Sequence, residues 1–250
     1  MKVMLFSGTS EGRILAEFCK ENHIEVQVHV ATEYGQKVMG EVPVVVGRMD
    51  CEEMVRELRA YQPDYVVDAT HPYAVEVTEN IRGACEREGF FYIRLFRQPE
   101  DIAMQDKKGI IKVSSIKEAA EYLSATKGNI LVATGSKELA AYTVLADYRN
   151  RIYLRALPTE AVKKQCRELG IAKEHLILEQ GPFSIEQNRL HIRKCKAAYI
   201  VTKESGKAGG FSDKIEAAKS ENITVIVVCR PAKENGYSLS EVIQMLRKKL

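Results

Sequence analysis

The sequence Lys2-Val3-Met4-Leu5-Phe6-Ser7-Gly8-Thr9-Ser10-Glu11-Gly12-Arg13 decides how the fold of this chain is interpreted. An apolar run is followed by a turn of small residues, and apolar side chains then recur at helical spacing at Ile14, Leu15, Phe18 and Cys19. This order predicts a strand, a short loop and a helix. Because a Rossmann-like α/β unit begins in the same way, we expect one at the N-terminus.

The loop of this stretch has the chemistry of an anion-binding site. Gly8 allows the backbone to approach a ligand closely, Thr9 and Ser10 offer hydroxyl groups, and the start of the helix carries partial positive charge. The alternative is a turn built for geometry alone, because Ser7 occupies a position where the Gly-x-Gly-x-x-Gly pattern has glycine. We predict an anionic cofactor here, with contacts from Gly8, Thr9, Ser10, Glu11, Gly12 and Arg13.

Length and composition are those of an ordinary globular protein. The chain has 250 residues, of which 45% are hydrophobic and 28% charged, so it can form one large domain or two small ones. The net charge is only +3 and basic residues are spread among acidic ones, so no nucleic-acid partner is predicted. No apolar run approaches the roughly 20 residues of a membrane span. Since no signal peptide precedes the first strand, we expect a cytoplasmic protein without membrane association.

The cysteines carry no pattern of a metal or redox site. They are scattered, without a Cys-x-x-Cys pair or a histidine at ligand spacing, and most lie within apolar stripes. We therefore interpret them as small buried side chains in a reducing compartment and predict no metal site. The six are Cys19, Cys51, Cys85, Cys166, Cys195 and Cys229.

A second candidate site follows the fourth predicted strand. Tyr65-Val66-Val67-Asp68 is nearly all apolar, as a central parallel strand covered on both faces should be. Ligands of open α/β sheets bind outside the carboxyl ends of the strands, so we expect Thr70, His71 and Tyr73 beside the first loop. Pro72 restricts His71 to an extended conformation, which fixes the direction of its side chain. His71 is the candidate for ligand contact or proton transfer; the alternative is a histidine that only holds the loop together.

A polar segment divides the chain. Between Arg97 and Lys108 the sequence loses its apolar pattern and contains Pro99, which is typical of a domain boundary. The second half repeats the alternation of strands and helices, with about five strands expected in each half. We therefore predict two Rossmann-like α/β domains with mainly parallel sheets, residues 1–100 and 101–250, facing a shared cleft.

The richest loop of the second half is Lys203-Glu204-Ser205-Gly206-Lys207-Ala208-Gly209-Gly210-Phe211-Ser212-Asp213-Lys214. Three glycines with serine and lysine, between a strand and a helix, are typical of a nest of amide donors for phosphate or carboxylate. It is not a Walker A loop, because Ala208 stands where serine or threonine would bind magnesium. A solvated loop without a ligand is the alternative.

Seven segments carry a resemblance to one known family. They are residues 8–13, 31–35, 68–74, 134–138, 155–158, 180–184 and 202–206. Their residues and their order resemble the precorrin-6A reductase family of cobalamin biosynthesis, including its cobalt-precorrin-6A branch, over nearly the whole chain.

The resemblance implies an oxidoreductase. It implies hydride transfer from NADH or NADPH to a ring double bond of precorrin-6A or cobalt-precorrin-6A, which gives the dihydro 6B product. The cofactor would carry the chemistry while the protein supplies proximity and electrostatics. The absence of a Gly-x-Ser-x-Gly elbow or another hydrolytic motif agrees with this. The implied partners are the anionic tetrapyrrole substrate and other enzymes of the cobalamin pathway.

The site residues are divided between the two halves as a hypothesis. The cofactor is assigned to the first loop together with Thr32, Thr70, His71 and Tyr73. Arg155 belongs to the wider set of cations available to the substrate carboxylates. The substrate is assigned to Gly135, Lys137, Gly181, Phe183, Lys203, Ser205, Gly206, Lys207 and Lys214.

Cofactor choice depends on the second predicted strand, Glu25-Val26-Gln27-Val28-His29-Val30. Its alternation predicts a half-exposed strand in which His29 points away from the core. Glu33 follows the strand, where an acid can bind the ribose hydroxyls and repel a 2′-phosphate, which favours NADH. A solvated turn acid is the alternative, since Lys37 follows, so both NADH and NADPH stay open.

Two other functions stay open. A tetrapyrrole methyltransferase would act on the same kind of substrate, but it needs a glycine-rich loop for S-adenosylmethionine, and Gly-x-Gly is absent. A non-catalytic nucleotide-binding module would bind the dinucleotide and oxidise none of it with any tetrapyrrole.

Overall fold

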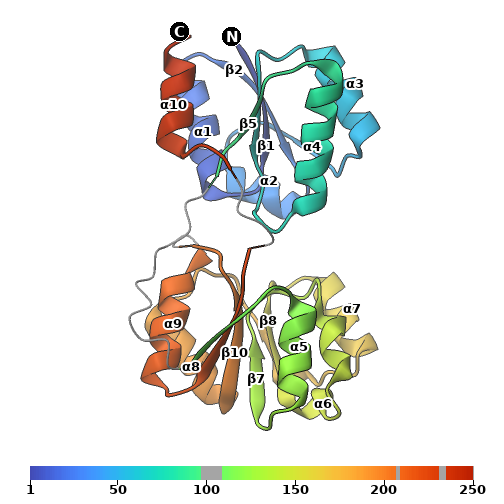
Figure 1. Cartoon of the computed structure of the whole chain (residues 1–250), viewed down its shortest axis with the longest axis vertical. Helices are drawn as coiled ribbons and strands as arrows, with labels where there is room; N and C mark the ends of the chain where they lie inside the picture. Colours follow the sequence, from blue (N-terminus) through green and yellow to red (C-terminus); the bar gives the residue numbers. More distant parts are fainter. Residues whose placement is uncertain (97–108, 207–208, 231–234, 250) are drawn as a thin grey trace. The chain divides into compact units, whose positions relative to one another are not determined.

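The structure, a computed structural model, describes residues 1–96, 109–206, 209–230 and 235–249. The chain divides into two compact units (Figure 1). Unit 1 comprises Met1–Gln98 and Ala232–Leu250, and unit 2 comprises Pro99–Pro231.

Unit 1 is a doubly wound α/β unit. Its sheet has the strand order β3-β2-β1-β4-β5, and every neighbouring pair is parallel. The elements are β1 (Lys2–Ser7), α1 (Ser10–Glu21), β2 (Glu25–Val30), α2 (Glu33–Met39), β3 (Val44–Val46), α3 (Cys51–Tyr61), β4 (Tyr65–Ala69), α4 (Val75–Glu88), β5 (Tyr92–Arg94) and α10 (Leu239–Arg247).

Helices cover both faces of this sheet. One core joins the sheet to α1, α2 and α10 and contains Leu5 and Leu15. The core on the other face lies under α3 and α4 and contains Met4 and Met54. Successive strand residues point to opposite faces, and Met4 and Leu5 are both fully buried. This explains why the sequence of β1 is a nearly continuous apolar run.

The C-terminal segment belongs to unit 1, whereas the sequence placed it in the second domain. Val242 and Leu246 of α10 are fully buried in the core shared with α1, and Figure 1 shows the two helices next to each other. Leu95 and Tyr237 also form an isolated parallel bridge. The apolar stripe of α10 therefore finds its partner surface on α1, which a division by chain order does not anticipate.

His29 lies inside unit 1, although the alternation of β2 predicted a solvated side chain. Its side chain is 2% exposed and its ring stacks on Phe6 with the centroids 5.1 Å apart. Among the described residues neither ring nitrogen has a hydrogen-bond partner. Burial lowers the pKa of His29, which keeps the ring neutral. The prediction was wrong because β2 lies between β1 and β3, where both faces of the strand are covered.

Unit 2 is also doubly wound and parallel. Its strand order is β6-β11-β10-β7-β8-β9. The elements are β6 (Ile110–Val113), α5 (Ile116–Ser124), β7 (Asn129–Val132), η1 (Leu139–Val144), α6 (Tyr148–Arg151), β8 (Ile152–Ala156), α7 (Glu160–Glu168), η2 (Lys173–His175), β9 (Leu176–Leu178), α8 (Ile185–Lys194), β10 (Ala197–Lys203), α9 (Phe211–Ser220) and β11 (Thr224–Val228).

The core of unit 2 is layered like that of unit 1. Helices α8 and α9 pack on one face of the sheet around Leu131, Ile200 and Ile215, while α5, α6 and α7 lie on the opposite side (Figure 1). The predicted α/β class with parallel sheets is thus confirmed for both units. The segment that follows Lys137 and Glu138 forms the 3₁₀-helix η1.

Two global properties follow from the part of the chain that is described. No helix there combines the length and the apolar character needed to cross a bilayer. Within the same residues, His, Cys, Asp and Glu side chains do not gather in groups of three or more that could hold a metal ion. All six cysteines are free, and four of them are buried.

Candidate functional site

The two predicted cofactor loops of unit 1 lie side by side. The chain runs from β1 outward through β2 to β3, and later from β4 outward to β5, so β1 and β4 flank the topological switch point of the sheet. Ser7 at the end of β1 pairs with Ala69 at the end of β4. The loops beginning at Gly8 and Thr70 therefore leave the sheet together, where open α/β sheets bind their ligands.

Hydrogen bonds join the β1 loop to the end of β4. The amide of Gly8 donates to the Ala69 carbonyl at 3.2 Å, and Thr9 Oγ1 donates to the same oxygen at 2.9 Å. Thr9 also caps helix α1, because its Oγ1 accepts the amide of Gly12 at 3.3 Å. Gly8 is exposed, and a Cβ added to it would lie only 3.4 Å from the backbone nitrogen of His71.

Gly12 has a packing role that the sequence did not reveal. It is buried on the sheet side of α1, and a Cβ added to it would overlap Ser7 Oγ and lie 3.0 Å from the Cβ of Ala69. In the dinucleotide-binding fingerprint the third glycine allows this close contact between helix and strand. Gly12 therefore supports the site by bringing α1 against β1 and β4.

Arg13 and Glu33 lie at the rim of the same edge. Arg13 is partly exposed on α1 and its Nη1 lies 3.3 Å from Glu17 Oε1. Thr32 caps α2 by accepting the amide of Gly35 at 3.1 Å, and Glu33 is exposed in the first turn of that helix. An acid at the end of β2 is thus available to a ligand at the switch point.

A buried ion pair lies under the β4 loop and was missed by the sequence analysis. Asp68 Oδ1 lies 2.8 Å from Arg94 Nη1, and both side chains are almost completely buried. The same carboxylate oxygen accepts the amide and the hydroxyl of Thr70, at 2.9 and 2.6 Å, and Tyr92 donates to its other oxygen at 3.0 Å. Thr70 Oγ1 also contacts Thr78 Oγ1 at 3.1 Å. The network fixes Thr70, the first residue of the loop.

His71 and Tyr73 are half-buried neighbours on this loop. The amide of Tyr73 donates to His71 Nδ1 at 3.3 Å, and the two ring centroids lie 5.6 Å apart. Because Nδ1 accepts, the neutral imidazole carries its proton on Nε2. This contact lies within the loop, and the ligand-contacting and proton-transfer roles of His71 stay predictions.

The β7 and β10 loops of unit 2 lie at the corresponding place in the second sheet. β7 and β10 are parallel neighbours, and Lys203 Nζ lies 3.0 Å from Glu138 Oε1, so an ion pair joins the two loops. Gly206 accepts the amides of Gly209 and Phe211, at 3.0 and 3.3 Å. Lys203 is thus engaged inside the protein instead of offering a free ammonium group.

The remaining predicted substrate residues are distributed over these loop ends. Lys137 is exposed after β7, and Ser205 is half-buried after β10. Lys214 is buried in α9 and donates to the Gly209 carbonyl at 2.5 Å. Gly135 has a φ of 79°, a left-handed conformation that favours glycine. Lys207 lies outside the described residues.

Phe183 packs against Arg155 in unit 2. It follows Gly181 and the cis-bonded Pro182, and the guanidinium carbon of Arg155 lies 4.3 Å from the centre of its ring. Arg155 and the ring therefore form a cation–π contact at the ends of β8 and β9. Sequence reasoning placed Phe183 in the site but did not predict this contact.

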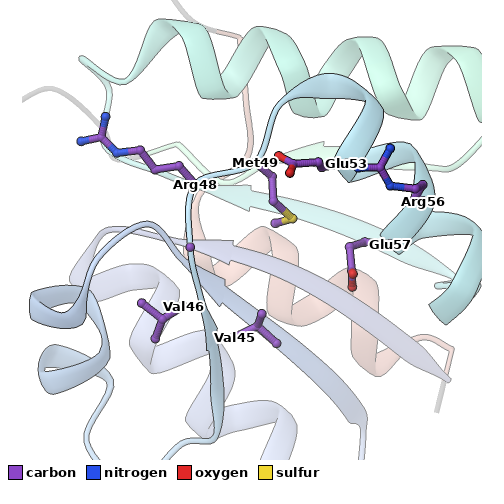
Figure 2. A pocket seen from close by; sticks show the side chains of 8 residues that line it. Val45, Val46, Arg48, Met49, Glu53, Arg56 and Glu57 are labelled. Atoms are coloured by element: carbon purple, nitrogen blue, oxygen red, sulfur yellow. The ribbon is translucent and has the colours of Figure 1, made fainter.

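A separate hollow lies at the edge of the unit 1 sheet, between β3 and α3 (Figure 2). It has a volume of about 320 Å³, and none of the predicted site residues lines it. Since β2 separates β3 from β1, the hollow is distinct from the switch point. It is lined by Val45, Val46, Gly47, Arg48, Met49, Glu53, Arg56 and Glu57.

The fold and these loops define a class of protein. Unit 1 is a doubly wound parallel unit with a glycine loop and a helix N-terminus at its switch point, an arrangement that is typical of dinucleotide-binding proteins. Comparison with known families places the chain within that class. The family described as "Precorrin-6x reductase CbiJ/CobK" matches residues 2–247, and the chain belongs to this family.

Relatives in three organisms support the family. The cobalt-precorrin-6A reductase of Priestia megaterium is 34% identical over 249 residues, covering 96% of either chain. That of Methanothermobacter thermautotrophicus is 35% identical over 241 residues, covering 92% of this chain and 77% of its own. That of Salmonella typhimurium is 32% identical over 232 residues, covering 92% and 87%. The resemblance stated from the motifs is thus confirmed.

One solved structure is similar over the full length. A structure titled "CobK precorrin-6A reductase" aligns with 99% of this chain and 97% of its own, with a TM-score of 0.79 and 21% identity. At this identity the similarity bears on the fold alone, which agrees with the two parallel α/β units.

Proposed function

We propose that this protein is an NAD(P)H-dependent reductase of precorrin-6A or cobalt-precorrin-6A in cobalamin biosynthesis. The observation that carries the proposal is membership of the precorrin-6x reductase family over residues 2–247. The doubly wound unit 1, with two loops joined at its switch point, supports the assignment of a dinucleotide.

The residues of unit 1 suit the cofactor. Gly8 is exposed and lacks a side chain that would block an approaching phosphate, and α1 is a 12-residue helix whose N-terminal dipole favours an anion. Arg13 adds a positive charge one turn into that helix. Glu33 at the end of β2 is assigned to the ribose hydroxyls, which favours NADH over NADPH.

The chemistry needs a hydride and a proton. The bound reduced nicotinamide supplies the hydride, and the neighbouring ring carbon takes one proton, so that one double bond is reduced. His71 is the candidate proton donor: as an imidazolium it would give one ring proton to that carbon and return to the neutral form, whose Nδ1 accepts the amide of Tyr73. The protein otherwise acts by positioning cofactor and substrate.

We assign the carboxylates of the tetrapyrrole to the loops of unit 2. Lys137 is exposed after β7, and a positive charge at that place suits an anionic ring. Phe183 offers an aromatic surface at the end of β9. Lys203 is assigned an indirect role, because it already pairs with Glu138.

The activity is tested with purified protein and anaerobic cobalt-precorrin-6A or precorrin-6A. NADH and NADPH are added in separate assays, and the near-ultraviolet absorbance of the reduced nicotinamide is followed. We expect the absorbance to fall only when cofactor and tetrapyrrole are both present. Binding of dinucleotide without oxidation by either tetrapyrrole would support the non-catalytic module instead.

The cofactor loop is tested with Arg13→Ala. Loss of the charge near the phosphates should weaken dinucleotide binding by more than about tenfold, which corresponds to about 1.4 kcal/mol. Lys20→Ala is the matched control, because Lys20 is exposed in the last turn of the same helix. An unchanged dissociation constant in Arg13→Ala would remove Arg13 from the site.

A further inference from the structure

Two buried cations in unit 2 have no counter-ion among the residues that the structure describes. Arg155 is 5% exposed and Lys214 is 8% exposed, and among the described residues neither forms an ion pair. Arginine and lysine are almost never buried this deeply unless a partner neutralises them. The nearest acids that act on them are Glu179, which is half exposed and contacts His191 instead, and Asp213 on the helix of Lys214 itself.

Neutral groups hold the guanidinium of Arg155 in one orientation. Its Nη1 donates to Asn188 Oδ1 at 2.8 Å and lies 3.1 Å from His191 Nδ1. His191 Nε2 lies 3.3 Å from Glu179 Oε2, so Nε2 carries the ring proton and Nδ1 accepts from Arg155. The ring of Phe183 covers one face of the guanidinium. Nη2 is buried without a hydrogen-bond partner in the described residues.

Such an unpartnered charged donor needs an explanation. A buried charged group that lacks a hydrogen-bond partner lowers the stability of the folded protein by on the order of several kcal/mol. Because the surrounding contacts fix the rest of the Arg155 side chain, Nη2 cannot turn toward another acceptor without breaking them. No described residue supplies the missing acceptor, which a bound anion would provide.

The N-terminus of helix α9 approaches the same cluster. Gly210 is its N-cap, with a φ of 63° and no side-chain cap. A Cβ added to Gly210 would lie 3.7 Å from the Phe183 carbonyl oxygen and 4.0 Å from Lys214 Nζ. Only one contact of that ammonium is recorded among the described residues, with the Gly209 carbonyl, and an ammonium has three N–H donors. Lys214 and the positive end of α9 thus lie near the backbone of Phe183, on whose ring Arg155 packs.

We infer that Arg155 Nη2 and Lys214 Nζ, beside the N-terminus of α9, form a binding site for one carboxylate group of the tetrapyrrole substrate. This inference rests on the proposed function for the identity of the anion. The two oxygens of a carboxylate match one guanidinium nitrogen and one ammonium group. The phosphates of the cofactor are assigned to unit 1, so the substrate is the source of the anion here.

Burial destabilises the charged forms of both cations. Burial and, to a smaller extent, the positive charge of Arg155 lower the pKa of Lys214 to about 8 against the attraction of Asp213. Burial also lowers the pKa of Arg155 to about 10. A bound carboxylate favours the charged form of Lys214, so binding near pH 8 is coupled to proton uptake.

The first test measures binding without turnover. Cobalt-precorrin-6A is titrated by calorimetry into wild-type protein and into Arg155→Met, Lys214→Met and Lys219→Met, without nicotinamide cofactor. We expect the two buried variants to lose about tenfold or more in affinity. Lys219→Met removes the same charge from the exposed last turn of α9 and is expected to bind like wild type. Unchanged affinity in Arg155→Met and Lys214→Met would overturn the inference.

Two further measurements separate the other outcomes. Dinucleotide affinity should be the same in all four proteins. Its loss in Arg155→Met, with tetrapyrrole binding intact, would assign the anion to a cofactor phosphate and overturn the carboxylate assignment.

Thermal melting of ligand-free Arg155→Met should occur at or above the wild-type temperature, because an uncompensated buried charge is removed. A large loss of stability together with intact tetrapyrrole binding would make Arg155 purely structural.

Wild-type protein gives a test that needs no variant. Calorimetry of cobalt-precorrin-6A binding at pH 8, in two buffers of different ionisation enthalpy, should show proton uptake; no uptake would contradict the role of Lys214. A different result would contradict the proposed function and leave this site in place. In that case Arg155→Met weakens tetrapyrrole binding, but wild-type protein oxidises no reduced nicotinamide when cofactor and tetrapyrrole are both present.

Discussion

Asp68 Oδ1 and Arg94 Nη1 lie 2.8 Å apart at the carboxyl ends of β4 and β5, with only 0% and 3% of their side chains exposed. Arg94 Nη1 also donates to the Thr70 carbonyl at 3.2 Å. The pair therefore supports the loop that is assigned to the cofactor, although neither residue is expected to touch the ligand. The Asp68–Arg94 pair acts by holding the loop that begins at Thr70 in position.

Arg94→Met tests this pair. The change leaves the Asp68 carboxylate buried without its cation, so we expect a loss of about 3–5 kcal/mol in the free energy of unfolding in urea. Arg59→Met is the control, because Arg59 is 61% exposed where it pairs with Glu88, and an ion pair with an exposed cation contributes less. Similar losses in both variants would show that the buried pair has no special role.

Gly12→Ala tests the close contact of α1 with the sheet. The added methyl group would overlap Ser7 Oγ, so α1 must move outward, and we expect a loss of about 1–3 kcal/mol in stability. Dinucleotide affinity should fall as well, because the same helix begins the site. Gly83→Ala is the control: its Cβ would meet only Cys51 Sγ, at 3.8 Å, so we expect no loss and a gain of up to about 1 kcal/mol. An equal response of the two variants would contradict the packing role of Gly12.

Glu33→Gln tests the choice between NADH and NADPH. If the carboxylate binds the ribose hydroxyls, its neutralisation should weaken NADH binding and relieve the repulsion of the NADPH 2′-phosphate. The kcat/KM for NADPH relative to that for NADH should then rise by about tenfold. Glu41→Gln is the matched exposed control. A ratio that is unchanged in Glu33→Gln would leave Glu33 as a solvated residue of the α2 N-terminus.

His29 makes stability depend on pH. Its pKa in the folded protein is lowered by burial from the ordinary value of 6.5, so the unfolded chain binds more protons as pH falls through that value. Wild-type stability should therefore decline as pH is lowered below about 6.5, and His29→Phe should show a flatter decline. His191, whose pKa burial also lowers, retains part of the slope. His23→Asn, at an exposed position, should behave like wild type; an unchanged slope in His29→Phe would contradict the prediction.

The sequence was sufficient for the elements and for the loops at their ends. The apolar run at residues 2–6 predicted β1, and the helical spacing of Ile14, Leu15, Phe18 and Cys19 predicted α1; the structure has both. Local patterns of this kind depend only on residues that are close in the sequence, so they can be recognised before the tertiary structure is known. The rule that ligands bind at strand ends then brought Gly8 and His71 together.

What the sequence missed depends on partners that are distant in the chain. Arg94 pairs with Asp68 across 26 residues, and Arg155 meets Asn188 across 33 residues; no local pattern marks either pair. His29 was placed outside because alternation was taken as a sign of one solvated face, whereas an internal parallel strand is covered on both. The C-terminal helix was placed in the second domain because chain order gives no information about which core accepts Val242.

The central claim is the transfer of a hydride from a nicotinamide cofactor to the tetrapyrrole. The most direct measurement uses reduced cofactor carrying deuterium at the transferring position of the nicotinamide, incubated with this protein and cobalt-precorrin-6A, followed by mass spectrometry of the product. We expect a dihydro product that has gained one deuterium from the cofactor and one hydrogen from the solvent. A product without deuterium, or recovery of unreduced tetrapyrrole with all of the cofactor still reduced, would contradict it.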